Sequence, residues 1–403
     1  MTQKNAIAVT AIALATAVGA FAWQKPAPVQ QYEAKLPAPF ATPSSNNRPH
    51  VVDRPNGAKL QVPAGFEIEE YATDFKTPRY MLLGPSNEIL LSDSDAGSVY
   101  VLVDKNHSNK NPERKEIAKG LDHPYGLALW KDFLYIGERT SVKRYKYDAK
   151  NLTVGPGQEI ISYAGFQPGH WTRSLLFDRK GEKLYVGVGS ASNVDAGEDP
   201  RRAAINRYNP DGSGHETYAS GTRNPIGIHW YPNTDTLWAA VQERDALGDD
   251  LVPDYFTHIQ QGGFYGWPYA YAGPHEDPRR KGEKPDLVAK TIPGDVLLQS
   301  HVAVLDFLFY TGKQFPKEYQ GGAFIAMHGS WNRSQRVGYE VAFIPFANGK
   351  PTGPVRDFMT GWLIAPESRD VWGRPVAVMQ LPDGSILVTD DGGRKIWRIY
   401  YKG

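Results

Sequence analysis

The sequence contains no cysteine in its 403 residues, and this absence excludes several classes of protein. Disulfide scaffolds, zinc–thiolate sites, iron–sulfur clusters, covalent c-type haem and a cysteine nucleophile all require thiols. A surplus of charge of one sign is also absent, because the formal net charge is +1. Nucleic acids and anionic membrane surfaces are bound through such a surplus, so neither is an expected partner.

Long amphipathic helical patterns are missing as well, so a layered α/β fold is not expected. The chain is instead rich in residues of turns and strands, with 40 Gly, 31 Pro, 22 Tyr and 10 Trp. Glycine and proline form tight turns, and aromatic side chains favour strands. The composition therefore predicts an all-β protein built from many short strands.

Residues 1–22 have the features of an export signal. Lys4 is their only charge, and a small, apolar run extends from Ala6 to Ala22 and ends in an A-x-A motif. This pattern is typical of a cleavable signal peptide. A buried N-terminal helix and an uncleaved membrane anchor are the alternatives. Export predicts a periplasmic or secreted protein, with membrane contact only if the segment is not cleaved.

Residues 23–59 form a proline-rich linker. Spaced prolines with few branched apolar residues are typical of an extended tether. We expect this linker to pack against nothing, and the folded domain is expected over residues 60–403.

The folded part repeats one theme six times: an apolar strand, a turn, a second strand that ends in a small or acidic residue, and a third strand. The repeats start at Tyr80, Tyr125, Thr172, Asn224, Val302 and Gly373. The first three intervals match the roughly 40–50 residues of a propeller blade, and the longer last two indicate insertions over roughly 262–300 and 350–372. The pattern predicts a six-bladed β-propeller, since ring closure buries both faces of every blade. A β-sandwich with irregular loops is the alternative.

One strand, Phe66–Tyr71, precedes the first repeat and has no place in it. We expect it to join the blade formed by the C-terminal repeat and so to fasten the ring.

Polar clusters stand next to the predicted inner strands, whose ends surround the axial channel of a propeller. One cluster contains His170 and Arg173. A histidine there is either a proton acceptor or a structural residue of the channel. Another contains Arg223 and Asn224, whose guanidinium and amide suit a planar anionic ligand, although such a tripeptide is more often a turn.

A third cluster is the acidic loop over residues 242–250, with Arg244, Asp245, Asp249 and Asp250. Its carboxylates and exposed carbonyls are oxygen ligands of the kind that Ca²⁺ prefers. The spacing is not that of an EF-hand, and a solvated acidic loop is the alternative.

The fourth cluster joins Trp331, Asn332 and Arg333 to Trp372 and Arg374. Their rings and guanidiniums suit a flat acidic ligand, held by stacking and ion pairing. Surface loops also contain such residues, so no cluster decides the function alone. Together the clusters predict one polar mouth at an end of the channel.

At these clusters the sequence resembles the soluble dehydrogenases of sugars that depend on pyrroloquinoline quinone (PQQ), and above all their sorbosone and aldose-sugar branch. The shared motifs follow the same order and cover nearly all of residues 60–401. They are GHWTR (169–173), GTRNP (221–225), ERDALGDD (243–250), YGWP (265–268), HGSWNR (328–333), GRP (373–375) and PDGSILVTDD (382–391).

The resemblance implies a six-bladed propeller that binds PQQ and Ca²⁺ and oxidises a sugar or a sugar-derived aldehyde. It implies that His170 is the general base. It further implies that Arg223 and Asn224 contact the quinone, and that Arg223 stabilises the developing oxyanion.

The resemblance also assigns Ca²⁺ to main-chain oxygens near Arg244 and Asp245, in a loop braced by Asp249 and Asp250. Arg374 would bind the carboxylates of the cofactor. The remaining residues assigned to the cofactor are Arg173, Asn332 and Arg333.

The sequence departs from the glucose-oxidising members, which have a lysine where this chain has Asn332 and Arg333, so glucose specificity is not carried over. No C-x-x-C-H motif for haem is present, so electrons are expected to leave to an external acceptor. Two alternatives stay open: a lactonase-type hydrolase, and a non-catalytic propeller that binds carbohydrate or protein.

Overall fold

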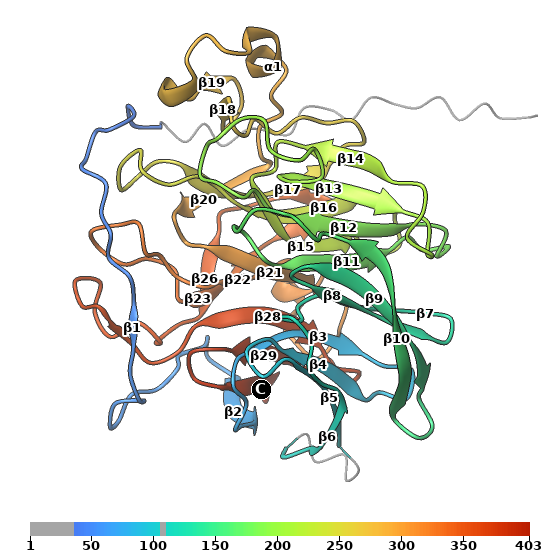
Figure 1. Ribbon diagram of the computed structural model, residues 1–403. Helices are drawn as coiled ribbons and strands as arrows, with labels where there is room; N and C mark the ends of the chain where they lie inside the picture. The colour runs from blue at the N-terminus through green and yellow to red at the C-terminus, as the bar shows by residue number, and fades with distance from the viewer. Residues whose placement is uncertain (1–35, 105–109) are drawn as a thin grey trace, which may run out of the picture. The chain divides into compact units, whose positions relative to one another are not determined.

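The computed structural model describes residues 36–104 and 110–403, so the predicted export signal lies outside the described residues. In these two stretches, six four-stranded sheets succeed one another along the chain (Figure 1). The predicted six-bladed, all-β propeller is confirmed. None of the helices in the described part is both long and apolar enough to cross a membrane.

The first three blades use consecutive strands. Blade one consists of β3 (Pro78–Leu83), β4 (Ile89–Asp93), β5 (Ser98–Val103) and β6 (Glu113–Ala118). Blade two consists of β7 (Leu127–Trp130), β8 (Phe133–Glu138), β9 (Ser141–Asp148) and β10 (Thr153–Ser162). Blade three consists of β11 (Arg173–Phe177), β12 (Leu184–Val188), β13 (Ala204–Tyr208) and β14 (Glu216–Ser220).

The last three blades use strands that are more distant in sequence. Blade four consists of β15 (Asn224–Trp230), β16 (Leu237–Gln242), β17 (Pro253–Ile259) and β20 (Val296–Ser300). Blade five consists of β21 (Val304–Phe309), β22 (Ala323–Met327), β23 (Glu340–Ile344) and β26 (Arg356–Met359). Blade six consists of β28 (Pro375–Gln380), β29 (Ile386–Asp390), β30 (Lys395–Tyr401) and β2 (Phe66–Ala72).

Short elements lie outside the blades. They are β1 (His50–Val51), β18 (Ala270–Tyr271), β19 (His275–Glu276), η1 (Pro278–Arg280), α1 (Pro285–Ala289), η2 (Lys317–Tyr319), β24 (Phe346–Ala347), β25 (Lys350–Pro351) and β27 (Asp370–Val371).

The burial and the residue types of a strand depend on its position in the blade. The second strands β4, β12, β22 and β29 are buried at every residue, because neighbouring blades cover both of their faces. The outer strand β6, with the sequence ERKEIA, is exposed at its first four residues. Charged residues on an outer strand protect a sheet edge that would otherwise pair with another chain.

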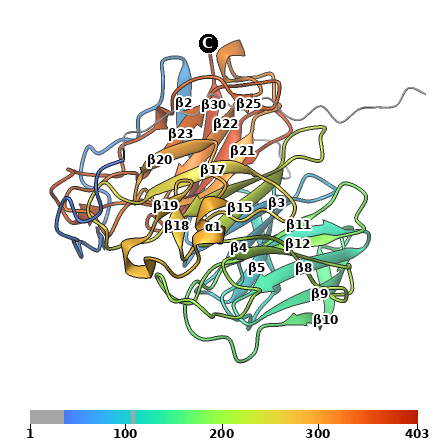
Figure 2. The same ribbon diagram turned by 90° about the horizontal axis from the view of Figure 1, so that it is seen from above.

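The ring closes through the strand that precedes the first repeat. The inner strands contact one another in the order β3, β7, β11, β15, β21, β28 and back to β3. In blade six, β2 pairs antiparallel with β30, with Phe66 opposite Tyr401, and Figure 2 shows the two strands side by side. The prediction for Phe66–Tyr71 is therefore confirmed: an N-terminal strand completes the C-terminal blade.

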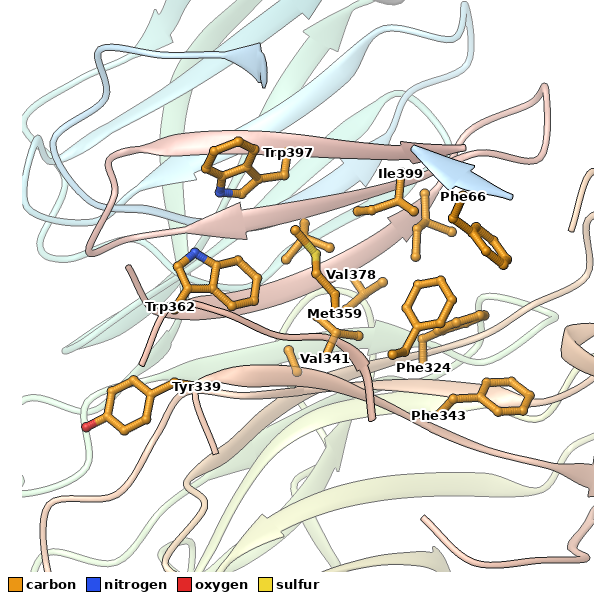
Figure 3. Packing of buried hydrophobic residues seen from close by; sticks show 14 of the residues in the cluster. Phe66, Phe324, Tyr339, Val341, Phe343, Met359, Trp362, Val378, Trp397 and Ile399 are labelled. Atoms are coloured by element: carbon orange, nitrogen blue, oxygen red, sulfur yellow. The ribbon is translucent and has the colours of Figure 1, made fainter. Parts of the chain in front are cut away.

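The largest buried cluster lies between blades five and six, where it fixes this closure (Figure 3). Phe66 of β2 makes edge-to-face contacts with four rings, at centroid distances of 4.8 to 5.2 Å. These partners are Phe315, Tyr319, Phe358 and Tyr401. Edge-to-face pairs add to the free energy gained by burial alone, so the closing strand is anchored by packing as well as by hydrogen bonds.

The two predicted insertions require a correction. The range 262–300 contains β20, and the range 350–372 contains β26, and each is the outer strand of its own blade. The true excursion of blade four lies between β17 and β20 and holds β18, β19, η1 and α1, at the top of Figure 1. The repeat pattern missed the outer strands because long loops separate them from their partners.

The prediction that the linker packs against nothing is wrong for its described part, residues 36–59, which we call the strap. The strap is extended, but β1 pairs in parallel with β27, and the amide of Asn47 donates to the carbonyl of Trp331 at 2.8 Å. Thr42 Oγ1 accepts from the amide of Asp249 at 2.7 Å. Spaced prolines prevent a hairpin within the strap, which leaves its polar groups free to pair with the blade loops.

Replacing Asn47 with alanine is expected to destabilise the protein by about 1–2 kcal/mol, since it removes a partner of a buried guanidinium. Arg336 is 2% exposed and donates to Asn47 Oδ1 at 2.7 Å. Urea unfolding measures the change. Asn46→Ala, at the exposed neighbouring position, is the control. Equal urea midpoints for the two variants would contradict a structural role for the strap.

Candidate functional site

A polar cavity of about 180 Å³ lies where the inner strands of blades three, four and five begin. It is lined by His170, Arg223, Gln242, Glu243, Asp245, Asp254, His301, Ala303 and Trp331. Two of its residues, His170 and Arg223, stand just before β11 and β15. The structure thus brings together one residue from each of the four predicted clusters: His170, Arg223, Asp245 and Trp331.

His170 is held in one tautomer. Its Nδ1 lies 2.8 Å from the main-chain oxygen of Ser190 and 3.2 Å from the Ser190 hydroxyl. A carbonyl oxygen only accepts, so Nδ1 carries the proton and Nε2 keeps a free lone pair. Burial, followed by the positive charge of Arg223, lowers the pKa of His170 to about 3. The imidazole is therefore neutral at neutral pH and able to accept a proton at Nε2.

A glycine allows this histidine to lie beside Asn224. A Cβ atom on Gly189 would lie 2.5 Å from the His170 Cβ and 2.2 Å from Asn224 Oδ1. Contacts this short do not occur with a real side chain, so Gly189 is required for the two residues to approach each other.

Arg223 and Asn224 present polar atoms without protein partners. Arg223 Nη1 donates to the Glu243 carbonyl at 2.6 Å, and Nη2 lies 3.1 Å from Asp245 Oδ2. Its buried Nε, however, has no hydrogen-bond partner among the described residues, and the same holds for Asn224 Oδ1. Buried polar atoms are nearly always paired in native proteins. Arg223 lines the cavity, and Asn224 follows it in sequence but is not among the lining residues. The two unpartnered atoms are compatible with a polar, planar group such as PQQ.

Asp245 connects two cations of the cavity. Its carboxylate pairs with Arg223 and lies 3.5 Å from Nδ1 of His301. Burial opposes ionisation of this carboxyl, but Arg223 and His301 outweigh burial and lower its pKa. Nearby Asp254 accepts from the amide of Glu243 at 2.7 Å, and burial raises its pKa to about 7. The cavity thus holds one carboxyl group with a lowered pKa, Asp245, and one with a raised pKa, Asp254.

Arg244 does not face the cavity. Its guanidinium is fully buried and pairs with Glu243 at 2.9 Å and with Asp277 at 3.2 Å. It also donates to the carbonyl of Pro268 at 3.0 Å. Arg244 thus fastens the acidic loop to the excursion of blade four.

Asp249 and Asp250 lie at the far end of the acidic loop. Asp249 accepts from the amide of Ser334 at 3.0 Å, and Arg333 pairs with Asp250 at 2.7 Å. Asn332 accepts from the amide of Ala246 through Oδ1 and donates through Nδ2 to the strap. These four predicted site residues connect loops to one another, and none lines the cavity.

Arg173 is also directed away from the cavity. It is 1% exposed, donates to the carbonyls of His170 and Thr172, and lies 4.9 Å over the ring of Tyr163. The expectation that Arg173 contacts a cofactor is not supported, because its guanidinium is enclosed between blades two and three.

Arg374 lies at the same end of the channel but outside the cavity. It precedes β28 and donates to the carbonyls of His328 and Gly329 at 3.1 and 3.3 Å. His328 lies 2.9 Å from Asp391, which also pairs with Arg79. This places a second polar group of residues between blades five, six and one.

Sequence analysis missed several residues of the site. His301 and Asp254 line the cavity, and Asn193 donates to the Asp245 carbonyl at 2.9 Å. A signal for His301 was available, since it precedes an inner strand as His170 does. Asp254 and Asn193 stand in loops and strands without a distinctive pattern.

A larger cavity of about 540 Å³ lies at the opposite ends of the inner strands. Its walls are mostly aliphatic and aromatic, with His229 paired to Asp306 at 2.8 Å. None of the residues predicted for the site lines it.

The acidic loop does not fit Ca²⁺ as the resemblance expects. The Asp245 main-chain oxygen, one of the two expected ligands, already accepts from Asn193 and from Arg279. Among the described residues, no group of three or more acidic or histidine side chains could hold a metal ion, which concerns side-chain ligands and not main-chain oxygens.

The fold and the cavity together define a propeller with a polar cavity at one mouth. The chain belongs to the TrAA12-like family, whose sequence profile matches residues 60–272 and 281–402. An uncharacterised protein of Borreliella burgdorferi is 31% identical over 85% of this chain and 91% of its own length.

Two further comparisons concern a relative with a named activity and a solved structure of similar fold. A PQQ-dependent pyranose dehydrogenase of Coprinopsis cinerea is 24% identical over 75% of this chain, which matches 48% of that protein's length. A calcium structure of family AA12 from Trichoderma reesei has a TM-score of 0.72 at 20% identity, covering 88% of this chain and 99% of that one. The resemblance to the soluble PQQ-dependent sugar dehydrogenases is thus confirmed at the level of the family.

Proposed function

We propose that this protein is a PQQ-dependent dehydrogenase that oxidises a sugar or a sugar-derived aldehyde, of the sorbosone or aldose type. The observation that carries this proposal is the convergence of His170 and Arg223 on one cavity, with the adjacent Arg223 Nε and Asn224 Oδ1 buried and unpartnered. The family supports it, since the relatives of this chain include a PQQ-dependent pyranose dehydrogenase and an aldose sugar dehydrogenase.

In this proposal Arg223 and Asn224 would hold the cofactor through their unpartnered atoms. When bound, PQQ supplies an electrophilic quinone that accepts a hydride. Nε2 of His170 takes the proton from the substrate hydroxyl, because Nδ1 is already committed to Ser190. Arg223 stabilises the negative charge that develops on oxygen, since it is fixed in place before the reaction by Glu243 and Asp245.

The proposal includes export to the periplasm or the exterior, where an external electron acceptor removes the electrons. Calcium is not part of it, because the expected Asp245 oxygen is occupied by protein donors.

The test is reconstitution of the full chain with PQQ, with sugars and aldehydes as donors and an artificial dye as electron acceptor. We expect reduction of the dye that requires both PQQ and a sugar or aldehyde as the electron donor. Absence of PQQ binding at micromolar concentration would overturn the proposal. Hydrolysis of lactones without PQQ would instead indicate the lactonase alternative.

A further inference from the structure

Arg279, a residue outside the motifs, holds the acidic loop at the oxygen expected to bind calcium. Its Nη1 donates to the main-chain oxygen of Asp245 at 2.8 Å. The same oxygen accepts from Nδ2 of Asn193 at 2.9 Å. A carbonyl oxygen has two lone pairs, so both are used by donors of the protein itself.

Other main-chain oxygens of the loop are also engaged by protein donors. They are those of Glu243, Leu247, Gly248 and Asp249, which accept from Arg223, Phe40, His301 and Arg333 respectively. The loop is therefore fixed from several sides, by the strap as well as by neighbouring blades.

The charges around residues 243–245 of the loop balance without a metal ion. Three guanidiniums face three carboxylates: Arg223, Arg244 and Arg279 against Glu243, Asp245 and Asp277. Asp277 is fully buried, yet Arg279 and Arg244 outweigh the effect of burial and lower its pKa. Arginine stays protonated in proteins, so at neutral pH the negative charge that would attract a divalent cation is already compensated.

Asp277 and Arg279 come from a stretch that the family profile does not match. The match ends at residue 272 and resumes at residue 281. Asp277 and Arg279 thus lie outside the part of the chain that matches the family, although both contact the loop directly.

We propose that Arg279 replaces Ca²⁺ as the fixed cation of the acidic loop, so that this protein binds PQQ without calcium. The inference rests on the proposed function, because it concerns how the same site holds its cofactor. Arg279 is a positioning residue: it fixes the Asp245 carbonyl, and the side chain of Asp245 in turn orients Arg223.

The experiment titrates the full apo chain with PQQ, followed by absorbance and by quenching of protein fluorescence. Each titration is done once with millimolar Ca²⁺ and once with a chelator. We expect the wild-type dissociation constant to agree within about threefold between the two conditions. For Arg279→Gln we expect binding at least about tenfold weaker in chelator, with recovery in Ca²⁺, since the freed oxygen then accepts the metal.

Arg280→Gln is the matched control, because Arg280 is adjacent but donates to Val194 and pairs with the exposed Asp195. It should behave as the wild type does. If Arg279→Gln does not fold, as judged by circular dichroism and thermal unfolding, Arg279→Met takes its place, since it also removes the charge and the donor to Asp245.

A wild-type protein that binds PQQ at least about tenfold tighter in Ca²⁺ than in chelator would overturn the inference and leave the proposed function intact. Failure to bind PQQ in either condition would remove the proposed function and this inference with it.

Discussion

Replacing His170 with alanine is expected to lower turnover by at least about a hundredfold while PQQ binding changes little. The histidine offers one free lone pair, at Nε2, because Nδ1 donates to the main-chain oxygen of Ser190. The cavity also contains His301, but both of its nitrogens are engaged, by Gly248 and Asp245. His170 is thus the histidine of the cavity with a nitrogen available for proton transfer.

The measurement is steady-state dye reduction together with PQQ titration of the same samples. His275→Ala is the control, since that imidazole is exposed and bonds only within its own turn. Turnover of His170→Ala within about threefold of the wild type would show that His170 is not the general base. Loss of PQQ binding alongside turnover would show a structural role.

The acid limb of the pH–rate profile is expected far below the usual histidine range. A general base acts when unprotonated, so the rate falls as pH falls through its folded-state pKa. Burial and Arg223 place this pKa for His170 at about 3. The rate constant kcat/KM should therefore show no loss due to His170 between neutral pH and about pH 5. A limb near the ordinary histidine pKa would show that His170 is not held in this environment.

Much of the fold could be predicted from the sequence because its signal is repeated. Each blade has its own alternation of apolar and polar residues and its own turns, so an error in predicting one repeat does not affect the next. The strand Phe66–Tyr71 could be assigned to the last blade by elimination. The strands β20 and β26 could not, since their pairing with β17 and β23 spans long loops and leaves no local pattern.

The site was predicted less completely, because a motif gives residue types and not the direction of side chains. His170 and Arg173 stand three residues apart, yet one lines the cavity and the other is enclosed against Tyr163. Arg244 and Asp245 are neighbours, and only the aspartate faces the cavity. The Arg279 contact could not be predicted at all, because nothing in the sequence relates it to Asp245.

Asp277→Asn is expected to destabilise the protein by about 3–5 kcal/mol, since it removes one of the two carboxylates that pair with the buried guanidinium of Arg244 and also removes the carboxylate that pairs with Arg279. Asp277 is fully buried and pairs with Arg244 at 3.2 Å and with Arg279 at 2.7 Å. Arg244 is itself fully buried, so its charge has no access to water. Asparagine has nearly the same shape as aspartate, so the loss of stability reflects the missing charge and not a change in packing. Urea unfolding followed by fluorescence gives the change in free energy.

The pH dependence separates this effect from a general loss of packing. The pKa of Asp277 lies below its usual value in the folded protein, so its stabilisation is complete above the unfolded-state pKa of about 3.9 and is lost as pH falls through the folded value. The difference in the free energy of unfolding between the wild type and Asp277→Asn should therefore become smaller as the pH falls.

The control is Asp132→Asn, which removes an exposed ion pair with Lys146. It should lower the free energy of unfolding by less than about 1 kcal/mol at any pH. Equal costs for the two substitutions would mean that the buried network contributes no more than a surface pair, and that Glu243 and the carbonyls of the excursion suffice to hold Arg244.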